Sequence, residues 1–259
     1  MPPSEPAPDT GRPSAGAPSA GRPSAGGASA GRASAGRASA GRADDRAGGP
    51  VGSGDHTEIT TREELLGLIG QPNPAVFSKA STVLREFERE WIRHAPLCFI
   101  ATAASDGTCD VSPKGDPPGF VHVLDDSTLA VPDRPGNRRL DSWLNVLQNP
   151  HVGMIFVIPG RGDTLRVNGR ARLVRSEQLL DRMVVKGNRP VLALLVDVDE
   201  AYFHCAKSFM RGAVWDPESW APDAAPSRAR IAKATEWTEV SLEALEERYG
   251  PSYARRLYP

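Results

Sequence analysis

Short apolar runs separated by turn sequences fill the middle of this 259-residue chain and restrict it to a largely antiparallel fold. Asp106-Gly107, between the first two runs, is a strong hairpin signal. The expected strands are Leu97–Thr102, Thr108–Ser112, Phe120–Leu124, Thr128–Val131, Val152–Ile158, Thr164–Val174 and Val191–Tyr202. Hairpin connections with only short inserted helices predict a mainly β protein built as an antiparallel barrel. The chain contains no GxGxxG or GxxxxGK sequence, which argues against a doubly wound sheet.

Helical periodicity is confined to short segments. Thr60 followed by Glu63 has the spacing of a capping box, and Asn137 is a candidate N-cap before a later apolar stripe. The expected helices run from Thr60 to Gly70, over Ser78–His94, from Asn137 to Asn149, over Ser176–Met183 and over Ser241–Tyr249.

The N-terminal part has a different composition, with the five-residue units GRPSA, GAPSA, GRPSA, GGASA, GRASA and GRASA following one another from Gly11 to Ala40. Such a tract has almost nothing large to bury, so we expect residues 1–56 to be a disordered low-complexity extension. An arginine-dotted tether that folds on a partner is the alternative. We expect a barrel domain with its N-terminal helices over 57–215, and a polar C-terminal extension with a short helix over 216–259.

Composition excludes several functional classes. The formal net charge of -1 and a pI of about 6.5 argue against a general nucleic-acid binder. No apolar run reaches the length of a membrane span, and the first residues lack a signal-peptide pattern, so we expect a cytoplasmic protein without membrane contact. The cysteines Cys98, Cys109 and Cys205 form no CxxC pair, so neither a disulfide framework nor a metal site is expected.

Two loops at strand ends concentrate positive charge. Residues 112–116 and 132–139 together carry four cations, namely Lys114, Arg134, Arg138 and Arg139, and the second loop leads into an expected helix. Guanidinium groups and a helix N-terminus are both suited to a phosphate or another compact anion. The sequence therefore predicts an anion site where the two loops meet.

The order of motifs resembles a known family. A SPKGD loop, a PDRPGNRR loop, a helix ending in NP, and the strands HVGMIFVIPG and TLRVNGRARL are similar to the FMN-binding split barrels of the pyridoxamine 5'-phosphate oxidase-like family, in particular its bacterial branch of FMN-dependent flavoproteins. The resemblance covers about residues 77–215. It implies an FMN-binding split β-barrel, a homodimer with FMN at the subunit interface, and FMN-dependent oxidoreductase activity on a small molecule.

The resemblance also implies roles for residues in the two loops. Arg138 and Arg139 match the basic pair that holds the FMN phosphate, and Gly136 and Asn137 let the backbone approach the ligand. The segment beside the flavin ring matches Val111, Ser112, Pro113 and Lys114, and the position lining the ribityl chain matches Pro132 and Asp133. Lys114 would place positive charge near the ring or the phosphate.

Further candidates follow these loops. Arg166 and Asn168 share one face of a strand and are expected to hold the flavin or order a substrate. The segment carrying His204, Lys207, Arg211 and Trp215 resembles the part by which the second subunit covers the flavin.

Other interpretations stay open at this stage. Arg138 and Arg139 also suit a solvated first helical turn, Gly136 and Asn137 a plain turn and cap, and Lys114 an exposed loop. A non-catalytic flavin-binding or redox-sensor protein is one functional alternative, and a split barrel that uses F420 or haem is another. No pattern in the sequence identifies the substrate or the electron donor.

Overall fold

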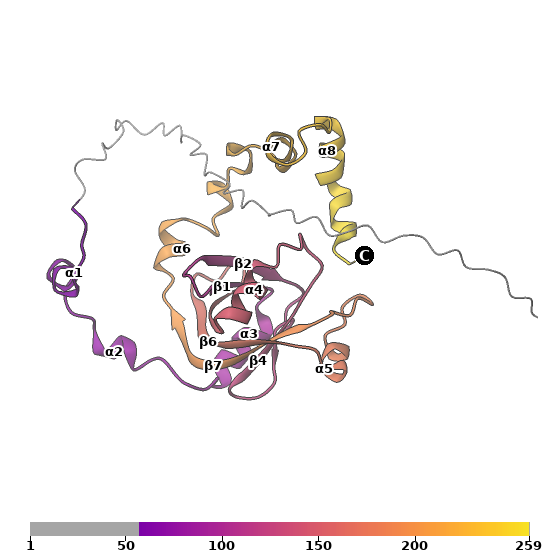
Figure 1. The fold of residues 1–259 in the computed structure, drawn as a ribbon. Coiled ribbons are helices and arrows are strands. Elements are labelled where there is room, and N and C mark those ends of the chain that lie inside the picture. Colours follow the sequence, from indigo (N-terminus) through magenta and orange to yellow (C-terminus); the bar gives the residue numbers. More distant parts are fainter. Residues whose placement is uncertain (1–56, 259) are drawn as a thin grey trace, which may run out of the picture. The chain divides into compact units, whose positions relative to one another are not determined.

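Seven strands, all paired antiparallel, form one sheet in the part of the chain that the computed structural model describes, residues 57–258 (Figure 1). They are β1 (Leu97–Ala103), β2 (Cys109–Gly115), β3 (His122–Val123), β4 (Thr128–Pro132), β5 (His151–Val157), β6 (Thr164–Val174) and β7 (Ala193–His204). Their order in the sheet is β2-β1-β5-β6-β7-β4-β3. The mainly β, antiparallel prediction is confirmed, while the extension predicted over residues 1–56 lies outside the described residues.

Side-chain alternation separates an inner from an outer face of the sheet. In β1, Cys98, Ile100 and Thr102 are buried, while the residues between them are partly or fully exposed. The pairing of β6 with β7 shifts register between Asn168 and Gly169. A Cβ on Gly169 would lie 2.2 Å from the carbonyl oxygen of Asp197, so the two backbones approach too closely there for any side chain.

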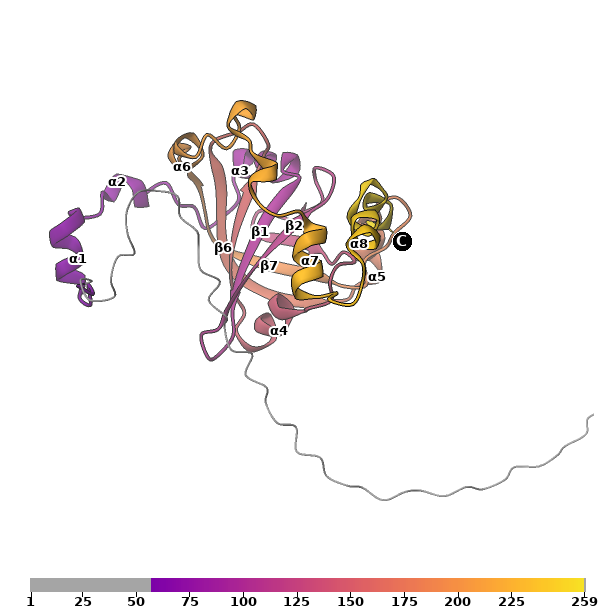
Figure 2. The ribbon, with the colours of Figure 1, turned by 90° about the horizontal axis from the view of Figure 1, so that it is seen from above.

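Two helices complete the main core. Trp91 and Ile92 come from α3 (Glu86–His94), and Trp143 and Val146 come from α4 (Asp141–Gln148). They pack with inward residues of the strands, including Ile100, Met154, Phe156, Leu165, Val167, Leu194 and Val196. Figure 2 shows α3 and α4 toward different ends of the strands.

The predicted N-terminal helices differ in detail from those observed. Helix α1 spans Arg62–Ile69, and its capping box is Thr61 with Glu64, one residue later than predicted. Two adjacent threonines allow both registers, and the Glu64 carboxylate accepts from the amides of Thr60 and Thr61, at 3.1 and 3.2 Å.

The helix predicted over Ser78–His94 is wrong in its first half. The chain instead forms α2 (Pro74–Phe77), and α3 begins only at Glu86. Ser81 exchanges two backbone hydrogen bonds with Ala201 of β7, at 2.9 and 2.8 Å. This pairing with a distant strand prevents an early helical start.

Short helices follow the main sheet strands in sequence. Ser176 caps α5 (Glu177–Arg182) and Ser241 caps α8 (Leu242–Tyr249), which confirms both predicted helices. The prediction missed α6 (Lys207–Arg211), α7 (Arg228–Thr235) and the short turns η1 (Pro217–Ser219), η2 (Pro222–Ala224) and η3 (Pro251–Arg256). Helices α7 and α8 share a small core of Ala229, Ala232 and Leu245.

Candidate functional site

A cavity of about 570 Å³ lies between β2, the loop that follows β4 and the start of α4. Most of the predicted cofactor-binding residues line it: Val111, Ser112, Pro113, Lys114, Asp133, Gly136, Asn137, Arg138 and Arg139. Pro132 lines an adjoining cavity of about 330 Å³, which shares Ser112, Lys114 and Asn137 with the larger one. The loop predicted over 112–116 is wrong in part, because Ser112–Gly115 belong to β2 and pair with β1. The fold nevertheless brings this cationic segment and the loop after β4 to one place.

The four cations of these loops have different environments. Arg134 is bound internally, because its guanidinium pairs with Asp116 and donates to the carbonyl oxygens of Met183, at 2.8 Å, and Asn188, at 3.4 Å. Arg139 pairs with Asp141, with 2.6 Å between Nε and Oδ2. Arg138 has no ion pair or hydrogen bond from its side chain to any residue between 57 and 258. Its guanidinium is therefore available to an anion.

The backbone around Arg138 is strained. Arg138 has a φ of 57° and Leu140 a φ of 64°, both in the left-handed region that disfavours residues with a Cβ. Each such residue costs roughly 1–2 kcal/mol. Backbone strain of this kind gathers at ligand-binding sites, where the surrounding structure holds it in place.

Helix α4 begins later than predicted, which corrects the roles of Asn137 and the arginines. Its N-cap is Leu140, and no side chain caps the first turn. The Asn137 carboxamide oxygen instead accepts from the amide of Arg139, at 3.1 Å. The two arginines therefore precede the helix, and its uncapped first turn faces the cavity through Asp141 and Trp143.

Lys114 lies over the indole of Trp143 in the cavity wall. Its ammonium is 4.7 Å from the Trp143 ring centroid and donates to Ser112 Oγ at 2.9 Å. Burial lowers the pKa of Lys114, and the carboxylates of Asp133 and Asp110 act in the opposite direction. A half-buried lysine with a depressed pKa in a cavity is a candidate functional group.

Asp133 completes this cluster from the end of β4. The indole N–H of Trp143 donates to Asp133 Oδ1 at 3.2 Å. Burial raises the pKa of the Asp133 carboxyl, against the opposing effects of Trp143 and of the nearby cations Lys114 and Arg134. Lys114, Asp133 and Trp143 thus form one polar and aromatic wall.

Arg166 and Asn168 do not line this cavity. They lie on the outer face of β6, where the Arg166 guanidinium is 5.2 Å from the Tyr202 ring centroid and Asn168 Nδ2 donates to Glu200 at 2.6 Å. The strand register nevertheless puts Asn168 in a row with Gly153, Ala101 and Val111, so this face continues to the edge of the cavity.

The segment expected to cover the flavin lies apart from the cavity within one chain. His204 ends β7, Lys207 and Arg211 lie on α6, and the Trp215 indole donates to the carbonyl oxygen of Arg161 at 2.7 Å. Arg161 also lines a separate hollow of about 720 Å³ with aromatic side chains, including Phe87, Trp91 and Phe203. That hollow is larger, but it contains none of the predicted site residues.

The part of the chain from Leu84 to Cys205 contains all seven strands, α3, α4 and the residues of the cavity. These residues, 84–205, match the family model described as pyridoxamine 5'-phosphate oxidase. This region, residues 84–205, belongs to the pyridoxamine 5'-phosphate oxidase-like family. Its sheet is the split barrel of that family, as the sequence predicted. No curated protein matches the chain significantly.

Several solved structures have a similar fold. HupZ from Group A Streptococcus is 18% identical, with 46% of this chain and 91% of that chain covered and a TM-score of 0.37. General stress protein 26 from Bacillus anthracis is 18% identical, with 44% and 88% covered and a TM-score of 0.32. An FMN-binding protein from Syntrophomonas wolfei is 13% identical, with 56% and 94% covered and a TM-score of 0.36.

Sequence reasoning missed several residues of the cavity in this family member. Asp110 accepts from Ser142 Oγ at 2.5 Å, and Arg189 and Val191 enter from the loop before β7. Trp143 packs in the main core, and its indole N–H also donates to Asp133 in the cavity wall. Arg189 lines the cavity only because segments distant in sequence pack together, and no local sequence pattern indicates this packing.

Residues 57–258 contain no cluster of three side chains suited to a metal ion. Across the same residues, no helix combines the length and apolar character that crossing a membrane requires.

Proposed function

We propose that this chain is an FMN-dependent oxidoreductase and that FMN binds in the 570 Å³ cavity. The observation that carries the proposal is that one cavity holds Lys114, the uncapped start of α4 and the Arg138 guanidinium, which no side chain in the described part of the chain pairs with. The volume lies within the roughly 300–1,000 Å³ typical of small-molecule sites. The substrate would be a small molecule, reduced or oxidised in exchange with a separate electron donor.

The cavity residues suit both ends of FMN. Arg138 and the first amides of α4 would hold the phosphate, with Arg139 offsetting the charge of Asp141 next to it. Ser112, Lys114 and Trp143 would lie along the ring system, with polar groups for its edge. FMN would supply hydride or electron transfer at its flavin ring.

Lys114 would tune the electrostatics of this site. Its ammonium is partly removed from water and fixed by Ser112 and Trp143, so its charge acts through a medium that screens it weakly. A fixed positive charge there favours negative charge on a neighbouring ring, which is the charge that a reduced flavin carries.

A second copy of the chain would cover the outer face of β1, β2 and β5. Val111, at 62% exposure, and Ile155, at 39%, lie on this face. Ala101 pairs with Val111 on one side and with Gly153 on the other, and Ile155 is two residues beyond Gly153. Such an exposed apolar face suits a protein interface. In a homodimer, Arg166, Asn168 and the segment from His204 to Trp215 of one subunit would contribute to the site of the other.

The phosphate claim is tested by comparing FMN with riboflavin, which lacks the phosphate. Replacing Arg138 and Arg139 together by alanine should weaken FMN binding by at least about tenfold, since a charge-assisted hydrogen bond is worth roughly 1.5–3 kcal/mol, and should leave riboflavin binding unchanged. Arg230→Ala, on the exposed face of α7, is the matched control. Unchanged FMN binding in the double variant would move the phosphate site elsewhere.

The class of activity is tested on the purified holoprotein. An oxidoreductase should show bound flavin that is reduced by NAD(P)H or reduced F420 and reoxidised by a substrate or oxygen through repeated cycles, whereas a sensor should not cycle. A colourless protein that gains no flavin spectrum on addition of FMN would contradict the cofactor assignment, and F420 and haem would then be the ligands to titrate.

The dimer is tested at Ile155. Ile155→Lys places a charge on the outer face and should give a monomer by light scattering, with FMN binding weakened in parallel. Leu68→Lys, at a residue that is 70% exposed on α1, should change neither property. A wild-type protein that is a monomer with FMN bound would refute an interface site.

A further inference from the structure

One wall of the cavity is the segment 189–191, which directly follows a tight hairpin turn between α5 and β7. Val185 and Asn188 exchange two backbone hydrogen bonds, at 3.1 and 2.9 Å, and the central residues Lys186 and Gly187 both have positive φ, 49° and 79°. The chain then continues through Arg189 to Val191, which line the cavity. The position of this turn therefore sets the shape of the cavity on that side.

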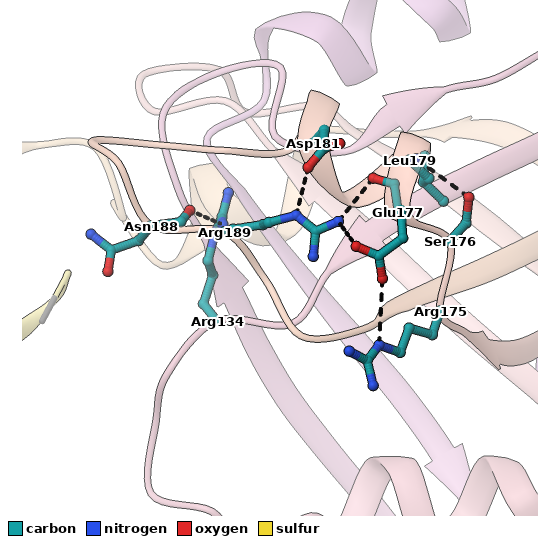
Figure 3. Close-up of polar contacts among 8 residues, drawn as sticks. All are labelled: Arg134, Arg175, Ser176, Glu177, Leu179, Asp181, Asn188 and Arg189. Atoms are coloured by element: carbon teal, nitrogen blue, oxygen red, sulfur yellow. Dashed lines mark hydrogen bonds and ion pairs between the residues drawn. The ribbon is translucent and has the colours of Figure 1, made fainter. Parts of the chain in front are cut away.

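Arg189 anchors the turn to α5. Its guanidinium donates to the Glu177 carboxylate at 2.7 Å, to the Glu177 carbonyl oxygen at 3.0 Å, and to Asp181 at 2.6 Å (Figure 3). These three hydrogen bonds hold the Arg189 guanidinium against α5, so Arg189 is a fixed part of the cavity wall.

Arg134 joins the turn to the loop after β4. It donates to the carbonyl oxygens of Met183 and Asn188, which lie on either side of the turn, and Figure 3 shows it reaching Asn188. Only 15% of the Arg134 side chain is exposed. A guanidinium held in this way fixes both carbonyl oxygens at once.

Asp116 and Tyr258 hold Arg134 in turn. The Asp116 side chain is 1% exposed, and one of its oxygens accepts from Arg134 Nε. The other accepts from the hydroxyl of Tyr258, 142 residues later in the sequence. The Lys186 ammonium at the tip of the turn lies 5.2 Å from the centroid of the Tyr258 ring. The C-terminal tail therefore contacts both the tip of the turn and the carboxylate behind its anchor.

We propose that Tyr258 is a positioning residue, which acts through Asp116 and Arg134 to hold the turn 183–191 as a wall of the cavity. Tyr258 does not line the cavity, so its effect on a bound ligand is indirect. Loss of the hydroxyl leaves a buried carboxylate oxygen without its donor and weakens the hold on Arg134. The consequence for ligand affinity rests on the proposed FMN site, but the link between tail and turn does not.

The contact between Tyr258 and the turn can be tested without any ligand, by measuring hydrogen exchange at the turn. Tyr258→Phe should speed hydrogen exchange of the Val185 and Asn188 amides by roughly three- to tenfold, the scale of one hydrogen bond. Tyr253→Phe is the matched control, because it removes a hydroxyl from the same tail without touching Asp116. Lys186→Met, which removes the ammonium above the ring, should give a smaller change in the same direction.

Flavin binding gives the second measurement on the full-length protein. Tyr258→Phe should weaken FMN and riboflavin by the same factor, because the wall does not hold the phosphate, whereas the Arg138 and Arg139 double variant should weaken FMN alone. Unchanged exchange at the turn overturns the proposal. So does faster exchange with unchanged affinity in a protein that binds flavin. If the wild-type protein binds no flavin, the FMN assignment fails and the exchange comparison alone decides whether Tyr258 positions the turn.

Discussion

The ammonium of Lys114 lies 4.7 Å from the centroid of the Trp143 ring, so a cation on an edge strand stacks on a residue of the first turn of α4. Trp143 also donates to Asp133, which places a carboxyl group within the same cluster. An ammonium fixed between an aromatic face and a hydroxyl cannot reorient freely. Lys114 is therefore a positioned charge and not a mobile surface lysine.

Removal of the Lys114 charge should shift the reduction potential of bound FMN. Lys114→Met keeps an unbranched side chain over Trp143 but removes the ammonium. We expect a negative shift of roughly 20–60 mV, or about 1–3 kcal/mol for a two-electron couple, because negative charge on the reduced ring loses its neighbour. Spectroelectrochemical titration measures the shift, and Lys79→Met is the control. A potential equal to that of the wild type would place Lys114 away from the ring.

Asn145 should be required for docking of α4 on the sheet. Its Nδ2 donates to Thr102 Oγ1 at 3.0 Å, and both residues are buried. Asn145→Ala leaves the Thr102 hydroxyl without this donor, so we expect a loss of about 1–3 kcal/mol in the free energy of unfolding, measured by urea denaturation. Gln148→Ala, on the exposed side of the same helix, should change it by less than about 0.5 kcal/mol.

Protonation of His122 should lower the free energy of unfolding in mild acid. Burial lowers the pKa of His122, with smaller effects from Arg182 and Arg134. Between this depressed pKa and the ordinary value of 6.5, the unfolded chain binds more protons than the folded one. The stability that neutral His122 contributes is therefore complete above pH 6.5 and is lost as pH falls through the folded pKa.

His122→Gln removes this titration. Urea unfolding at several pH values between 5 and 8 should show a smaller loss of stability on acidification than the wild type does. A steeper loss in the His122 variant would contradict the direction of the effect.

The three cysteines should differ in reactivity. Burial raises the pKa of the Cys98 thiol to about 12, so roughly one molecule in ten thousand carries the thiolate at pH 8. Cys109 and Cys205 are exposed. Iodoacetamide should therefore modify these two in the native protein and all three in guanidinium chloride, as read by intact mass. If Cys98 of the native protein were labelled as fast as Cys109, the inner face of β1 would be accessible to the reagent, which would contradict the burial of Cys98.

Local patterns predicted the strands well because each has an alternating face and a turn at its end. The Asp106-Gly107 hairpin and the short β3–β4 pair both formed between strands that are neighbours in sequence. Helix starts were less predictable. Contact with Ala201 delayed α3, and the left-handed Leu140 moved the start of α4, and neither event leaves a local signature.

In the candidate site, too, some features were predictable from the sequence and others depended on distant contacts. Strand ends and motif order predicted that the two cationic segments lie close together, and the structure brings both to one cavity, although Ser112–Gly115 belong to β2 and not to a loop. The sequence did not show which cations are available. Among residues 57–258, Arg134 pairs with Asp116 and Arg139 with Asp141, whereas the Arg138 side chain has no such partner. Charge pairing depends on where the carboxylates lie in space.

By itself, the sequence determined the antiparallel fold and the two cationic segments of the candidate site, which depend on residue spacing within single segments, and the family resemblance, which depends on the order of the motifs. The tertiary structure decided the rest. It places Arg189 in the cavity wall, and it brings Tyr258 within hydrogen-bond distance of Asp116, 142 residues earlier in the sequence. Such contacts form only when the core has packed and buried the partners, so their energy is a property of the fold and not of any local stretch.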